Sequence, residues 1–162
     1  MGQYHLLVNL DKFEYVHPHQ LGDGLKLWEQ AASSYGTCAA ACILLCAPEA
    51  RGGGDFDTDY PEAKEVVGRW HGDRVAWVGD YAEEYDLPEE DHAETIYARC
   101  DDDIPGVSYL RKPPEFRNIT KLLRPVLARE FNVKFEEETH KVYDPNGELL
   151  RTFTTTDRRL VD

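Results

Sequence analysis

The sequence has no apolar run long enough to cross a membrane. Its longest apolar stretch, residues 38–48, is too short to span a bilayer, because a spanning helix needs about 20 apolar residues. The first residues also lack the charged and then apolar pattern of a secretory leader. We therefore expect a cytoplasmic protein that makes no contact with membranes.

Cysteine is scarce, and four cysteines in 162 residues do not form a disulfide framework. Three of them, Cys38, Cys42 and Cys46, lie four residues apart, a spacing that places them along one stripe of a helix. Free cysteine is among the most buried residue types, so we expect these thiols to fill the core. A structural zinc site would need closer pairs with further ligands from loops. No cofactor is expected.

Basic residues are few relative to acidic ones. Eighteen Lys and Arg against 31 Asp and Glu give a net charge of −13 at pH 7. Such a charge repels bare nucleic acid and anionic membranes, so direct nucleic-acid binding is not expected. Two interpretations stay open. The acidity forms a face for a basic protein partner, such as one that itself binds nucleic acid, or it serves solubility and salt adaptation.

What the sequence does contain is enough apolar material for one core. Hydrophobic residues make up 41% of the chain, with nine Tyr, six Phe and three Trp. A chain of this length fits one domain, since single cores are usually built from about 100–200 residues. There is no internal repeat. We expect residues 1–162 to form a single domain.

Strand-like runs separated by short polar turns predict several β-hairpins. The hairpin nearest the C-terminus turns through Asp144-Pro145-Asn146-Gly147, a sequence typical of a tight turn. The predicted hairpins cover residues 4–17, 65–78 and 141–154, and further strands are expected at 95–100 and 133–135.

Three segments have helical patterns. Residues 25–32 and 120–131 carry apolar side chains at helical spacing, although Pro125 is expected to kink the second helix or shift its start. Residues 38–46 are apolar on every side, which predicts a helix buried in the centre of the core. Together these elements favour an α+β fold: a largely antiparallel sheet built from hairpins, with two to three helices on one face.

Several segments of the first half of the chain are distinctive. They include Met1-Gly2-Gln3-Tyr4, Gly22-Asp23-Gly24, Arg51-Gly52-Gly53-Gly54-Asp55 and Gly72-Asp73-Arg74-Val75. These segments resemble an uncharacterised family of small bacterial and phage proteins that begin with an MGQYY-type segment. That family has no assigned activity, so the resemblance implies no function. It implies only that the N-terminal hairpin, the glycine-rich loop and the segment 70–81 belong to one fold.

One set of residues fits a cysteine-dependent hydrolase or transferase. Cys38 falls in the first turn of a predicted helix, where the helix dipole stabilises a thiolate. His71 is similar to the strand-borne histidine of papain-like and bacteriocin-processing peptidases, and Asp80 or Asp86 would orient it. Gln30 would donate to an oxyanion, although it lies further from Cys38 than the papain-like pattern requires. The alternative is a packing cysteine and a turn histidine.

A second set is the loop that carries Asp55, Asp57 and Asp59 after three glycines. Alternating carboxylates of this kind resemble the first half of a calcium-binding loop. The sixth position is Tyr60 rather than glycine, and the twelfth is Val66 rather than glutamate. The pattern therefore predicts a weak divalent-metal site at most.

No motif is specific enough to name a reaction, so the sequence leaves the function unknown. The interpretation we favour is a non-enzymatic domain whose acidic surface binds a protein partner or a second copy of the chain. A cysteine-dependent enzyme and a divalent-metal-binding protein are the alternatives. Acidic clusters lie at residues 55–59, 83–94 and 101–103, and the carboxylates expected to bind come from the last two: Glu83, Glu84, Glu89, Glu90, Asp91, Asp101, Asp102 and Asp103.

Overall fold

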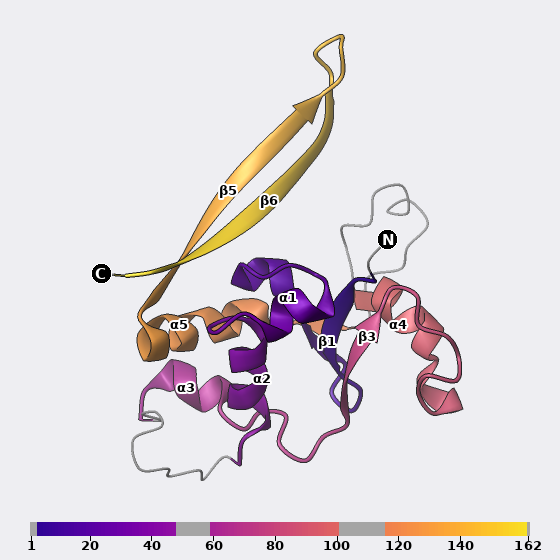
Figure 1. Ribbon diagram of the computed structural model, residues 1–162, viewed down its shortest axis with the longest axis vertical. Coiled ribbons are helices and arrows are strands. Elements are labelled where there is room, and N and C mark those ends of the chain that lie inside the picture. Colours follow the sequence, from indigo (N-terminus) through magenta and orange to yellow (C-terminus); the bar gives the residue numbers. More distant parts are fainter. Residues whose placement is uncertain (1–2, 48–58, 101–115, 162) are drawn as a thin grey trace.

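The structure is a computed structural model and describes residues 3–47, 59–100 and 116–161. Within these ranges the protein has an α+β fold, which confirms the predicted fold class. A body of helices around a four-stranded sheet carries a separate two-stranded ribbon (Figure 1). No helix in the described ranges has the length and apolar content needed to cross a membrane.

The four-stranded sheet is built around β1. Leu6, Leu7 and Val8 of this strand are all fully buried, because helices cover both faces of the sheet. β1 runs antiparallel to β2, which confirms the N-terminal hairpin, and antiparallel to β3 on its other side. The order is β3-β1-β2-β4, with β1 at His5–Asn9, β2 at Glu14–Val16, β3 at Val75–Gly79 and β4 at Arg117–Asn118.

Three helices cover one face of this sheet, and one covers the other. Side chains of α2, α3 and α5 share a core with Leu7 and Val16. Side chains of α4 pack with Leu6, Val8 and Val78 on the opposite face. The helices are α1 (Leu27–Ala31), α2 (Thr37–Leu45), α3 (Pro61–Val66), α4 (Ala93–Cys100) and α5 (Thr120–Phe131), with short 3-10 turns at Pro18–Leu21 and Glu89–Asp91. Helix α5 has the predicted bounds and contains Pro125.

Helix α2 is not buried on every side, so the prediction of a sealed apolar helix is wrong. Its buried side chains are Thr37, Ala40, Ala41, Ile43 and Leu44. The cysteine stripe lies on the open side, where Cys42 is exposed and Cys38 and Cys46 are half-buried. Because the residues of this helix are apolar all round, its composition could not indicate which side faces solvent.

The hairpin predicted at residues 65–78 does not form, although its second run becomes β3, which pairs with β1 instead. The first part of this segment completes α3, and the turn that follows closes the end of α2. The amides of Gly68 and Trp70 donate to the carbonyls of Ile43 and Leu44 at 2.9 and 2.8 Å. The last carbonyls of a helix have no partner within it, so these bonds satisfy the end of α2. They also insert the fully buried Trp70 into the core.

Residues 95–100 belong to helix α4 rather than to the predicted strand. Ala93, Ile96, Tyr97 and Cys100 are its buried side chains. Their spacing of three and four residues places them on one helix face, against the sheet.

The C-terminal hairpin is confirmed but is much longer than predicted. Strands β5 (Val133–Tyr143) and β6 (Leu149–Leu160) pair antiparallel along their whole length, so the runs at 133–135 and 141–143 are two ends of one strand. At about 3.4 Å per residue, such a ribbon is about 40 Å long. Figure 1 shows it projecting away from the body beyond α5. We call residues 133–160 the arm.

Candidate functional site

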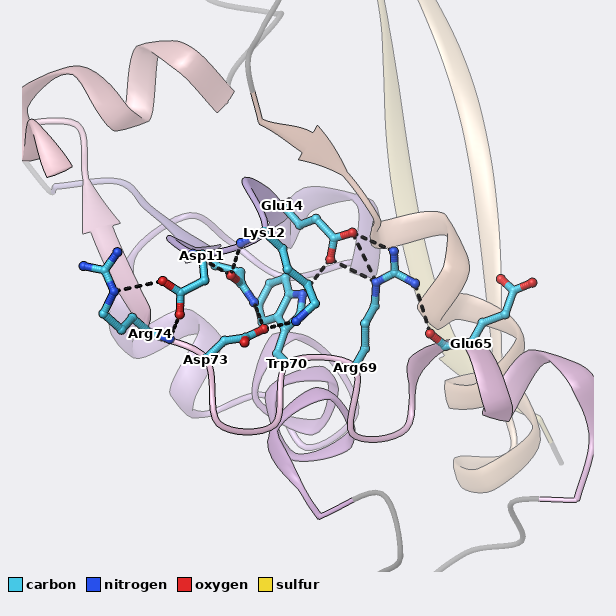
Figure 2. A network of polar contacts seen from close by, with 9 residues as sticks. Asp11, Lys12, Glu14, Glu65, Arg69, Trp70, Asp73 and Arg74 are labelled. Atoms are coloured by element: carbon cyan, nitrogen blue, oxygen red, sulfur yellow. Dashed lines mark hydrogen bonds and ion pairs between the residues drawn. The ribbon is translucent and has the colours of Figure 1, made fainter.

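A polar network fastens the β1–β2 hairpin to the segment before β3 (Figure 2). Its centre is Glu14, which is only 6% exposed. Glu14 accepts hydrogen bonds from Nε and Nη2 of Arg69 at 2.9 and 2.6 Å and from Nε1 of Trp70 at 2.8 Å. Burial raises the pKa of Glu14, but the hydrogen bonds from Arg69 and Trp70 outweigh burial and hold it below the usual value.

The other polar side chains of this network also have hydrogen-bond or ion-pair partners. The buried amide of Asn9 donates to Asp73, and its oxygen accepts from the backbone amides of Asp11 and Lys12. Asp73 also pairs with Lys12, and Asp11 pairs with Arg74 at 2.9 Å. Since the carboxylates of Asp11, Glu14 and Asp73 are all used in holding the turn, we assign the network a structural role.

The structure does not bring Cys38, His71 and Asp80 together. Cys38 lies in the first turn of α2, whereas Nδ1 of His71 lies 3.4 Å from the carbonyl of Leu45 at the other end of that helix. At 1.5 Å per residue, these two ends are about 10 Å apart. Asp80 lies beyond the far end of β3 from His71, where its carboxylate accepts the amide of Tyr4 at 2.9 Å.

The environments of these residues also differ from those of a catalytic set. Burial, followed by the charge of Asp23, raises the pKa of the Cys38 thiol, which is the opposite of nucleophile activation. The Gln30 side chain is not available to an oxyanion. Its amide nitrogen donates to the carbonyls of His5 and Leu25, and its oxygen accepts from Trp77 at 2.9 Å.

The candidate metal loop falls largely outside the described residues. Asp55 and Asp57 lie in the range 48–58, which the structure does not describe, and Asp59 is exposed. Within the described part of the chain, no three His, Cys, Asp or Glu side chains gather closely enough to hold a metal ion.

The acidic residues predicted to bind a partner separate into three groups. Glu83, Glu84, Glu89 and Glu90 are exposed on the segment between β3 and α4, beside the exposed rings of Tyr81 and Tyr85. Asp91 instead pairs with Arg74 at 2.9 Å and its side chain is only 9% exposed, so it helps to hold the segment. Asp101, Asp102 and Asp103 lie outside the described residues.

Two hollows stand out in the described structure. One, of about 210 Å³, lies beside β1 and β3 and is lined by Gln3, His5 and Trp77; it is smaller than the usual range for small-molecule sites. The other, of about 440 Å³, is an open groove between α5 and the base of the arm. We call it the α5–β5 groove, and it is lined by Lys121, Arg124, Pro125, Ala128, Val133, Lys134 and Phe135.

The base of the arm is anchored to the body by Arg158 of β6. Its Nη1 donates to the carbonyl of Leu21 at 2.6 Å and to the carboxylate of Asp23 at 2.8 Å, and its Nη2 bonds to Ser33. The Asp23 side chain is 1% exposed and also accepts the amide of Thr37 at 2.6 Å. Gly22, at a φ of 78°, allows its backbone to approach β6 closely, because a Cβ there would lie 2.8 Å from Cβ of Arg158.

A second arginine, Arg124 of α5, fixes β5. It donates to the carbonyl of Gln20 at 2.8 Å, to Glu137 at 2.6 Å and to Oγ1 of Thr156 at 3.1 Å, and it lies over the ring of Phe135. The two arginines therefore hold both strands of the arm up to about Glu137 and Thr156.

Beyond these anchors most side chains of the arm are exposed. We call residues 138–155 the distal half; here only His140 and Phe153 of the two strands are less than exposed, and their rings stack on each other at 4.9 Å. Four large apolar side chains gather at the tip and are 41–64% exposed: Val142, Tyr143, Leu149 and Leu150. This surface was not expected from the sequence, because residues 133–135 and 141–143 were predicted as two short strands and instead form one long strand.

No family model, curated protein or solved structure matches this chain, so its own geometry is the basis for assigning a function.

Proposed function

We propose that this protein is a protein-interaction module that binds its partner through the distal half of the arm. The observation that carries the proposal is a ribbon anchored firmly at its base, with both faces exposed beyond the anchors. An isolated two-stranded hairpin is only marginally stable in water, so a long one is expected to be covered in its working state.

The surface of the distal half suits a protein partner. At the tip Tyr143 pairs with Leu149, and Val142 and Leu150 adjoin them in sequence, whereas apolar side chains scattered singly would need no explanation. Among the described residues, no further strand pairs with the outer edge of either strand, and an open strand edge binds other chains by adding a strand to the sheet.

The anchored base favours binding because it positions the ribbon before the partner arrives. Arg124 and Arg158 fix the direction of the arm, and the His140–Phe153 stack orders the strands further out. Ordering a segment in advance lowers the entropy cost of association. The cytoplasmic location expected from the sequence stays a prediction.

The acidic segment at residues 80–92 is a second candidate surface. Its exposed carboxylates and its two exposed tyrosines favour a basic partner. Binding there should weaken steeply as salt rises, since exposed charges are screened. Contacts by the apolar tip of the arm should depend little on salt.

Site-specific photo-cross-linking separates the two surfaces. A photoreactive phenylalanine analogue replaces Leu150 at the arm tip in one variant and Tyr85 in the acidic segment in another; these side chains are 64% and 75% exposed. After irradiation in the cells that produce the protein, we expect a covalent adduct from position 150 and not from position 85. Adducts from position 85 alone would overturn the arm as the binding element, as would the absence of any adduct from position 150.

A further inference from the structure

We propose that the partner of the arm is a second copy of this chain, joined by antiparallel pairing of β5 with β5 around a two-fold axis at Thr139. This inference rests on the proposed function, because it names the partner of the same arm. The pairing would convert two separate hairpins into one continuous four-stranded sheet.

Strand β5 has an edge available for this pairing. One of its edges bonds to β6 from Val133 to Tyr143, and the two-stranded sheet has no third member among the residues that the structure describes. Along the outer edge, every second residue directs its N–H and C=O groups away from β6. Such a row of unpaired groups is a template for another strand.

The sequence of β5 is complementary to itself about Thr139. In a two-fold antiparallel pair, residues equally distant from the axis lie opposite each other on the same face. Glu137 then lies opposite Lys141, and Phe135 lies opposite Tyr143. Glu138 lies opposite His140 and Glu136 lies opposite Val142, while Thr139 faces its own copy.

Opposite charges and paired aromatic rings at facing positions stabilise antiparallel strands, and symmetry makes each of these pairs occur twice. When the two-fold axis is moved by one residue in either direction, these favourable facing pairs are lost. An axis at Glu138 places that carboxylate opposite itself, and an axis at His140 breaks the charged pair, because Glu137 then lies opposite Tyr143 and Lys141 opposite Thr139. Like charges directly opposite each other are destabilising, so the strand selects the axis at Thr139.

The body of the protein also fits this register. Odd-numbered residues of β5 share the face that contacts α5, since Val133 is buried and Phe135 packs against the core. Tyr143 of the second copy, on the same face and opposite Phe135, would therefore lie over the α5–β5 groove. Pro125 and Ala128 supply apolar walls there.

The carboxylate of Glu137 can bind Lys141 of a second copy while it keeps its bond to Arg124. Arg124 bonds to Oε1 of Glu137, which leaves Oε2 for Lys141 of the second copy. Lys141 is exposed, as are Thr139 and the ring of Tyr143, so each can reach a partner without rearrangement of the body.

Disulfide cross-linking tests the register directly. In a Cys42→Ser background, which removes the exposed native thiol, the variant Thr139→Cys places two sulfurs at the axis. Facing residues of antiparallel strands have Cα atoms about 4.5–5.5 Å apart, which suits a disulfide. The matched control is Thr154→Cys, which lies opposite Thr139 on β6 but would be about 14 Å from its own copy, three strand spacings away.

Under mild oxidation we expect a covalent dimer from Thr139→Cys and at least tenfold less from Thr154→Cys and from the background chain. Equal cross-linking of the two variants, or none from Thr139→Cys, would overturn the inference. As a second measurement, Lys141→Glu should weaken dimerisation by about tenfold or more in sedimentation, because both Glu137–Lys141 pairs become repulsive. Arg151→Glu, with the same charge change on β6, should have a much smaller effect.

Failure of this inference can be told apart from failure of the proposed function. If Thr139→Cys does not cross-link while position 150 still yields an adduct with a different protein, the arm binds a foreign partner and only the self-pairing is wrong. If neither yields an adduct, both proposals fall.

Discussion

Removing the arginine that anchors the arm should destabilise the whole protein. Arg158→Ala deletes the bonds to the Leu21 carbonyl, to Asp23 and to Ser33 in one step. Asp23 stays behind with a side chain that is 1% exposed, and the amide of Thr37 is then its remaining hydrogen-bond donor among the described residues. The variant therefore leaves a buried carboxylate without its cation.

The size of the effect follows from the burial of this pair. Breaking a buried ion pair from one side costs about 3–5 kcal/mol, because the remaining charge has lost its solvent and its partner. For a chain of this length, each kcal/mol lowers the melting temperature by about 2–4 °C. We therefore expect Arg158→Ala to lower the melting temperature by about 10 °C.

Urea unfolding followed by tryptophan fluorescence measures the loss of unfolding free energy, and a thermal melt measures the shift in melting temperature, since Trp70 is fully buried in the core. The neighbouring Arg159 provides the matched control, because it is 67% exposed and its ion pairs among the described residues are with surface carboxylates. Arg159→Ala should leave the unfolding midpoint nearly unchanged. A loss below about 1 kcal/mol for Arg158→Ala would refute the reasoning, since it would mean that water replaces the guanidinium at no cost.

Two further predictions concern the body. The pKa of Glu14 in the folded protein lies below the ordinary value of 4.5, so its stabilising contribution is complete above about pH 4.5 and is lost as the pH falls through the lower folded value. Glu14→Gln should be less stable at neutral pH and should lose less stability on acidification, as measured by urea unfolding at several pH values; a pH dependence equal to that of the wild type would contradict the assignment. For the cysteines, iodoacetamide should modify the exposed Cys42 of the folded protein quickly, the half-buried Cys38 slowly and the buried Cys100 only after unfolding. Mass spectrometry of the peptides would show the order, and rapid modification of Cys38 near neutral pH would revive the cysteine-enzyme alternative.

Local sequence patterns predicted some elements well. The N-terminal hairpin and α5 have clear alternation and helical spacing, and their tertiary surroundings agree with these local signals. Helix α4 was predicted as a strand because Thr95, Ile96 and Tyr97 favour strands individually. The spacing of its buried residues is helical and would have corrected the prediction had it been extended back to Ala93.

Other features depend on long-range contacts that no local pattern contains. Trp70 looks like a strand residue, but its amide closes the end of α2 and its indole bonds to Glu14. The predicted site residues Cys38 and His71 are separated by the length of α2, which composition cannot reveal. The length of the arm was missed because residues 136–140 are polar, and polar residues suit a strand only when both of its faces meet water.

Hydrogen exchange at two protein concentrations tests most directly the central claim that the outer edge of β5 is the contact surface. Peptides covering residues 138–144 should exchange more slowly in the concentrated sample, because the backbone amides of a free edge gain partners when two copies pair. Peptides from the acidic segment at residues 80–92 should exchange alike at both concentrations. Unchanged exchange at 138–144, or slowing confined to residues 80–92, would contradict pairing through β5.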